Sequence, residues 1–223
     1  MAIGMATPIS VVIPVGPRPE HSRWLDAATA SVRDEMRTGD EMVIVANGTD
    51  IGTKWRYFRT VKVWKSPWPL GVPVSFNVGV GLAKNEHVLL MGSDDVLLDG
   101  CLDACRKSIE DYQDPLGWYY LGVEYSDGRT QNTPCHASVV TKALWEFTGG
   151  FPPESAVGRC DTILISMLLS NHGRGWTGDF HSVSNEPLYW WRIHPDQETR
   201  RRQSSWGSIA KLVRDVLTVE WKP

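Results

Sequence analysis

An apolar run that ends in two carboxylates occurs before the middle of the chain, in the segment Glu86-His87-Val88-Leu89-Leu90-Met91-Gly92-Ser93-Asp94-Asp95. The nearly continuous apolar character of Glu86 to Met91 is typical of a strand that is covered on both faces. Parallel sheets bind their ligands at the carboxyl ends of such strands. We therefore expect Asp94 and Asp95 to face a ligand, although an Asp pair at this place also caps helices or remains solvated.

Similar runs precede this segment and alternate with helical patterns. Strands are predicted over Ile9 to Val15, Glu41 to Ala46 and Thr60 to Trp64, and helices over Glu20 to Met36 and Val74 to Ala83. This alternation predicts a nucleotide-binding-type half over about residues 1–98. Its ligand would lie where three loops converge, namely Pro14 to Pro17, Ala46 to Asp50 and Gly92 to Asp95.

The rest of the chain, about residues 99–223, is less regular and shows no linker, so the sequence predicts one α/β domain. The expected elements are a helix after Asp99, strands at Trp118 to Val123, Ala137 to Val140 and Leu188 to Ile193, helices at Lys142 to Thr148 and Asp161 to Leu169, and a terminal helix marked by Trp206 to Leu217. Gly149 to Arg159 is rich in Gly and Pro, which suits a mobile loop at the site and an inert surface loop equally well.

The composition is that of a folded globular protein. Of 223 residues, 42% are hydrophobic and 22% charged, and the formal charge of −3 gives no general attraction to nucleic acid or anionic membranes. Met1 to Thr7 lacks a signal-peptide pattern and no apolar run is long enough to span a bilayer, so we expect a soluble cytoplasmic protein. The four cysteines match no disulfide framework, and Cys101, Cys105, Cys135 and His136 lack zinc-site spacing.

Taken in order, several segments resemble the family 2 glycosyltransferases of the GT-A fold. Ser10 to Val15 is similar to the family's opening strand, Val43 to Asp50 to its second-strand motif, and the Asp94-Asp95 turn to its metal-binding turn. Further likeness lies in Gly71 to Gly79, Ala83 to Leu90, Leu144 to Phe151, Arg159 to Thr162 and Tyr189 to His194. The resemblance implies a single Rossmann-like domain with a mostly parallel sheet flanked by helices, whose residues after about 99 form an acceptor half.

The resemblance also implies a reaction and its residues. The activity would be inverting transfer of a sugar from a nucleoside diphosphate sugar to an acceptor hydroxyl, assisted by Mn²⁺ or Mg²⁺, with Asp161 as the general base. The implied site residues are Pro14, Asn47, Asp50, Asn77, Ser93 and Asp94 for the donor, Asp94, Asp95 and His194 for the metal, and Trp145, Gly150 and Phe151 on the acceptor side. Structural roles compete with two of these, because Asp161 also suits a helix cap and His194 a buried structural histidine.

Departures from the family pattern keep alternatives open. Gly92 stands where the first Asp of the metal turn is usual, Ala46-Asn47 replaces an acidic pair, Phe76 replaces an Arg, and Cys160 replaces the Glu before Asp161. A non-catalytic nucleotide- or glycan-binding homologue is therefore one alternative.

A second alternative is a glycosyltransferase that acts on hydroxylated nucleic-acid bases, suggested by Arg200 to Arg202 and the 11 Trp residues. Val15 to Pro19 is only a poor match to the Gly-rich, basic loop that a nucleotidyltransferase would have after its first strand. Gly79-Val80-Gly81 lies inside a predicted helix, which disfavours a dehydrogenase. The acceptor class stays open among glycan, protein, lipid and modified DNA, and the sequence predicts no oligomeric state.

Overall fold

The computed structural model describes residues 7–152, 160–172 and 175–197. Within these ranges one mixed sheet runs in the order β3-β2-β1-β4-β8-β6-β9-β5, with β7 paired to β6. The strands are β1 (Ile9–Val15), β2 (Glu41–Asn47), β3 (Val61–Ser66), β4 (His87–Leu90), β5 (Val96–Leu97), β6 (Trp118–Tyr125), β7 (Thr130–Gln131), β8 (Ser138–Thr141) and β9 (Phe180–Trp191). The predicted α/β class is confirmed.

The first four strands form the parallel part of the sheet. β1 lies between β2 and β4, with Val12 opposite Val43 on one side and Leu90 on the other. β8 then pairs antiparallel with both β4 and β6, whereas β9 returns parallel to β6. The parallel strands all end at one edge, which brings the loops after β1, β2 and β4 together as predicted.

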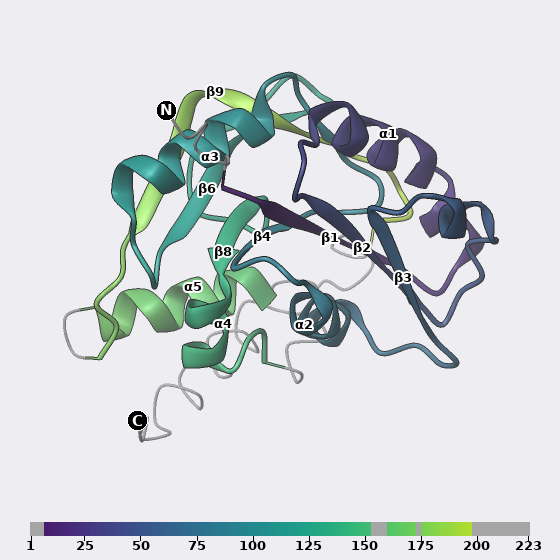
Figure 1. Ribbon diagram of the computed structural model, residues 1–223, viewed down its shortest axis with the longest axis horizontal. Coiled ribbons are helices and arrows are strands. Elements are labelled where there is room, and N and C mark those ends of the chain that lie inside the picture. The colour runs from purple at the N-terminus through teal and green to yellow at the C-terminus, as the bar shows by residue number, and fades with distance from the viewer. Residues whose placement is uncertain (1–6, 153–159, 173–174, 198–223) are drawn as a thin grey trace.

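Helices cover both faces of the sheet (Figure 1). Helices α1 (Leu25–Glu35) and α3 (Cys101–Tyr112) lie on one face and α2 (Val72–Leu82), α4 (Lys142–Thr148) and α5 (Cys160–Asn171) on the other. Val11 and Ile13 join the core under α1 and α3, while Val12 joins the core under α2, α4 and α5, because successive strand side chains point to opposite faces. Gly79 lets α2 approach closely, since a Cβ there would lie 2.2 Å from Val12 Cγ1.

Two predicted elements differ from the structure. The expected helix over Glu20 to Met36 is divided into a 3-10 turn, η1 (Pro19–Ser22), and α1, and the expected strand at Leu188 to Ile193 is the end of the longer β9. A second 3-10 turn, η2 (Lys54–Tyr57), precedes β3. The predicted terminal helix, the Arg200 to Arg202 cluster and most of the Gly149 to Arg159 loop lie outside the described residues. No helix in the described part of the chain is long and apolar enough to cross a membrane.

Candidate active site

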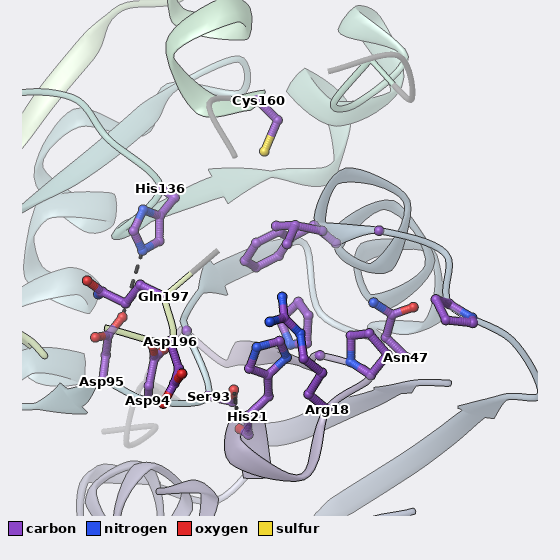
Figure 2. A pocket seen from close by; sticks show the side chains of 18 of the residues that line it. Arg18, His21, Asn47, Ser93, Asp94, Asp95, His136, Cys160, Asp196 and Gln197 are labelled. Carbon is purple, nitrogen blue, oxygen red and sulfur yellow. Dashed lines mark hydrogen bonds and ion pairs between the residues drawn. The ribbon is translucent and has the colours of Figure 1, made fainter. Parts of the chain in front are cut away.

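A cavity of about 560 Å³ lies at the carboxyl edge of the parallel strands. Its walls come from the loops after β1, β2 and β4, the start of α5 and the end of β9. Figure 2 shows the carboxylates of Asp94 and Asp95 at one end, Asn47 at the other, and Arg18 and His21 between them. Figure 2 also shows His136 and Cys160 on the opposite wall. The acidic pair and Asn47 therefore lie at different ends of the cavity.

The end near Asn47 is shaped by a close approach of two loops. Gly48 has a φ of +69°, and a Cβ there would lie 2.7 Å from the Pro69 nitrogen, so only glycine lets the loop before α2 pack here. The buried Asn47 side chain accepts a hydrogen bond from the Leu70 amide. The remaining surface of this end is contributed by Pro14, Gly16, Pro17, Gly71, Val72 and Phe76. The result is a largely apolar slot in which the Asn47 oxygen is already bonded to the Leu70 amide.

Asp94 and Asp95 follow β4 in a tight turn and have different surroundings. Asp94 is partly exposed and its Oδ2 lies 2.8 Å from Nε2 of the buried His194. Asp95 is buried, and its carboxylate accepts hydrogen bonds from the Tyr189 hydroxyl at 2.6 Å and the Arg192 amide at 2.9 Å. Burial, followed by the nearby charge of Asp94, raises the pKa of Asp95 above its ordinary value. Both residues line the cavity, but Asp94 is the more exposed carboxylate, while both oxygens of Asp95 accept hydrogen bonds from the protein.

His136 connects the acidic turn to the opposite wall. Its imidazole lies between two carboxylates, with Nε2 3.9 Å from Asp95 Oδ2 and Nδ1 3.8 Å from Asp161 Oδ2. Burial alone would lower the pKa of this imidazole, but attraction to Asp161 and Asp95 outweighs burial and raises it to about 9. His136 is therefore an imidazolium at neutral pH.

Asp161 begins the first turn of α5 and is held by backbone donors. Its Oδ2 accepts from the His136 amide at 3.1 Å and its Oδ1 from the Thr162 amide at 2.8 Å. Burial would raise the pKa of Asp161, but the charge and hydrogen bonding of His136 outweigh it and lower the pKa. This carboxylate lines the cavity, and its lowered pKa favours the ionised form. Asp161 lies inside the first turn of α5, and its bond to the helix is to the amide of the next residue.

Several predicted site residues lie off the cavity surface. Asp50 is exposed and pairs with Lys65 at 2.7 Å. Asn77 exchanges two hydrogen bonds with the backbone of Phe151, at 2.8 and 2.9 Å. Trp145 and Phe151 are buried and pack edge to face in the core beside α2, and Gly150, with a φ of +76°, joins them in a tight turn. The structure thus brings together Pro14, Asn47, Ser93, Asp94, Asp95, Asp161 and His194, and not the other predicted residues.

The chemistry of the acidic end suits a divalent cation that is shared with a ligand. No group of three or more His, Cys, Asp or Glu within the described ranges is arranged to hold a metal by itself. Asp94 Oδ2 and His194 Nε2 supply two adjacent ligand atoms 2.8 Å apart, and a cation held by both would replace the hydrogen bond that they share. Mg²⁺ and related ions bind through one or two protein ligands together with water and substrate phosphates. The pair therefore fits such an ion.

Sequence reasoning missed three residues around this site. His136 carries no local signal, because its partners come from residues 95 and 161, far away in the chain. Tyr189 and Arg192 lie in the segment that resembles the family's closing strand, where the resemblance implies a role for His194 alone. Their contacts with the Asp94-Asp95 turn depend on the pairing of β9 with β5.

Comparison with known proteins relates the fold to solved structures. No family model matches the chain, and no curated protein matches it. The S. aureus TarS fragment 1–349 in complex with UDP-GlcNAc is similar over 96% of this chain, with a TM-score of 0.76 and 17% identity. This chain spans 68% of that fragment and 40% of a longer TarS structure.

A second similar structure is the mannosyltransferase PcManGT from Pyrobaculum calidifontis in complex with GDP-Man and Mn²⁺. It matches over 78% of this chain and 54% of its own length, with a TM-score of 0.56 and 15% identity. Identities this low establish the architecture and not the substrates. The chain has the fold of the GT-A glycosyltransferases.

Proposed function

We propose that the chain is a metal-assisted glycosyltransferase that moves a sugar from a nucleoside diphosphate sugar to an acceptor hydroxyl with inversion. The observation that carries this proposal is that one cavity holds the Asp94–His194 pair and the ionised Asp161 on different walls. The similar structures were solved with UDP-GlcNAc and with GDP-Man and Mn²⁺, which supports a donor of this class.

The donor would lie along the length of the cavity. Its base and ribose fit the slot formed by Pro14, Asn47 and the loop before α2, and its diphosphate would lie beside Ser93 and Asp94. Asp94 and His194 would hold Mn²⁺ or Mg²⁺, which neutralises charge that develops on the leaving diphosphate. Asp95 supports the turn that carries Asp94.

Asp161 would act as the general base. Its carboxylate takes the proton of the acceptor hydroxyl while the acceptor oxygen forms a bond to the anomeric carbon. The bond from that carbon to the diphosphate oxygen breaks, and its electron pair leaves with the nucleoside diphosphate. Attack from the face opposite the leaving group inverts the configuration. The lowered pKa of Asp161 keeps the base ionised at neutral pH.

A donor panel tests this proposal. Thermal unfolding and sugar release would be measured with UDP-, GDP-, CDP- and dTDP-sugars, in Mn²⁺, Mg²⁺ and EDTA. We expect one nucleotide class to raise the unfolding temperature in a metal-dependent way, because a ligand that binds only the folded state stabilises it. Asp94→Ala should lose this response.

A matched control is Asp127→Ala, which removes an exposed carboxylate paired with Arg129 outside the cavity. This variant should respond like the wild type. Stabilisation without any sugar release or transfer would favour the non-catalytic nucleotide-binding homologue. No response to any donor would overturn both the enzyme and that alternative.

A further inference from the structure

Tyr189 ties the two ends of the Gly92 to Asp95 turn together. Its buried hydroxyl accepts a hydrogen bond from the Gly92 amide at 2.9 Å and donates one to Asp95 Oδ2 at 2.6 Å. The other oxygen of Asp95 accepts from the Arg192 amide at 2.9 Å. Both oxygens of this carboxylate therefore have partners from β9 or the residue that follows it.

The Asp95 carboxylate lies where a side chain of residue 92 would begin. A Cβ on Gly92 would lie 2.5 Å from Asp95 Oδ2 and 2.8 Å from Asp94 Oδ1. Asp94, whose side chain is 25% exposed, would lose its hydrogen bond to His194 if it moved away. Asp95 cannot move without losing the bonds to Tyr189 and Arg192. The glycine at this position is thus a requirement of the way the turn is held.

Arg192 fixes the other side of the turn. Its Nε donates to the backbone carbonyl of Asp94 at 2.9 Å. The guanidinium lies 4.9 Å from the ring centre of Trp24 and 4.6 Å from that of Trp190. Its own carbonyl accepts a hydrogen bond from the buried Gln197 side chain. These contacts leave the Arg192 side chain little rotamer freedom, so the side chain can hold the Asp94 carbonyl oxygen in place.

We propose that Tyr189 and Arg192 form a clamp that positions the Asp94 carboxylate by fixing Asp95 above Gly92. The clamp holds the turn through its bonds to Asp95. The Asp94 carboxylate then remains available to contact the ligand. Neither Tyr189 nor Arg192 lines the cavity, so both are positioning residues. The inference rests on the proposed function of the cavity as a donor site, and it accounts for the absent first Asp of the turn.

The first test removes one hydroxyl. Binding of UDP and GDP would be measured by titration calorimetry in Mn²⁺ and in EDTA, and the ratio of the two affinities gives the metal-dependent part. Tyr189→Phe should lower this ratio by about 10–100-fold while affinity in EDTA changes little, because partners that orient a metal ligand typically contribute that much to metal affinity. Arg192→Lys should lower this affinity ratio less, because the hydrogen bond from the backbone amide of residue 192 to Asp95 remains.

The matched control is Tyr119→Phe. Tyr119 is also fully buried, and its hydroxyl likewise accepts an amide, that of Asp114 at 3.1 Å, and donates to an oxygen, the Asp114 carbonyl at 3.2 Å. This variant should lose comparable stability and keep the wild-type ratio. An unchanged ratio in Tyr189→Phe would overturn the clamp, whereas a wild type without metal-dependent affinity for UDP and GDP, and without a metal-dependent response to any donor of the panel, would overturn the proposed function instead.

The second test needs no ligand. Gly92→Ala should lower the unfolding temperature by about 3–6 °C in the wild type, an effect of order 1–2 kcal/mol for a chain of this size. In the Asp95→Ala background, Gly92→Ala should lower the unfolding temperature far less, because the carboxylate that obstructs the new methyl group is gone. Equal effects in the two backgrounds would show that Asp95 does not occupy the space above Gly92 and would overturn the clamp.

Discussion

Both oxygens of Asp161 accept hydrogen bonds from backbone amides, and the residue still lines the cavity, so its chemistry can be tested separately from these bonds. Asp161→Asn keeps an oxygen for one of these amides but removes the base. We expect kcat for sugar transfer to fall by about 10²–10⁴-fold, the usual contribution of a general base, with donor affinity nearly unchanged. Steady-state kinetics with calorimetry of donor binding measures both quantities.

Ser166→Ala is a suitable control for that variant, because its hydroxyl donates to the Thr162 carbonyl on the exposed part of the same helix. It should keep the wild-type kcat. A wild-type kcat in Asp161→Asn would contradict the role of Asp161 as base.

His136 predicts a pH dependence of stability with a definite sign. Because the folded-state pKa is raised to about 9 from an ordinary value of 6.5, the unfolded state loses its proton first as the pH rises. The stabilisation is therefore complete below about pH 6.5 and is lost as the pH rises through about 9. The upper bound of this stabilisation is about 3.5 kcal/mol, because the pKa rises from 6.5 to about 9 and each pKa unit corresponds to about 1.4 kcal/mol.

The measurement is urea unfolding of the wild type and His136→Gln from pH 6 to pH 10. The difference in unfolding free energy between the two proteins should shrink as the pH rises through this window. A difference that stays constant, or grows, would contradict an imidazolium held between two carboxylates.

At this scale the sequence indicated some residues of the site and missed others for a physical reason. Asp94 and Asp161 follow or begin regular elements, and such positions can be recognised from local patterns. The role of His136 arises only when residues 95, 136 and 161 meet in space. Trp145 and Phe151 suit both an acceptor wall and a core by composition, and the structure packs them in the core.

At the scale of elements, the Asn77 side chain joins α2 to the turn after α4 through one donor and one acceptor hydrogen bond, as a backbone amide group would. Asn77 accepts from the Phe151 amide and donates to its carbonyl. Asn77→Asp keeps the acceptor but replaces the donor with a lone pair facing a carbonyl. We expect a loss of about 1–3 kcal/mol in unfolding free energy, the penalty for an unsatisfied buried polar group.

Chemical denaturation gives that loss, and donor affinity measured below the unfolding transition shows whether Asn77 also contacts the donor. Unchanged affinity would indicate a purely structural role. A stability like that of the wild type would contradict the reciprocal bonding.

Most elements are predictable because their patterns are strong, as the apolar run of β1 illustrates. β9 is an exception. Its first half contains His181, Ser182 and Ser184 and is only partly buried, so it lacks an apolar pattern. Pairing with β6 through irregular register near Gly122 maintains it as a strand, and this depends on tertiary contacts.

At the scale of the whole molecule, the edge of the sheet opposite the cavity is held by a buried ion pair. Arg106 from α3 contacts Asp40, whose carboxylate also accepts from the amides of Ile9 at 2.8 Å and Arg37 at 2.7 Å. Arg106→Leu should lower the unfolding free energy by about 3–5 kcal/mol, because it leaves a buried carboxylate without its cation. Donor affinity below the unfolding transition should not change.

Denaturant unfolding and calorimetry check the two parts of this prediction. Arg129→Leu, which removes an exposed arginine that pairs with Asp127, serves as the control and should have a small effect. Weakened donor binding in Arg106→Leu would show that the two edges of the sheet are coupled.

The partners of Asp94 and Asp95 from residues 189, 192 and 194 are separated from them by 94 to 100 positions. The N-terminus of a nascent chain leaves the ribosome first. A nascent chain that has emerged only as far as the middle of β9 therefore exposes both aspartates without these partners. Until the residues as far as His194 leave the exit tunnel, the growing chain would have the slot that we propose for the nucleoside but no ordered acidic end. We therefore expect the capacity to hold a metal-bound donor to arise only after these residues have emerged, as a single event.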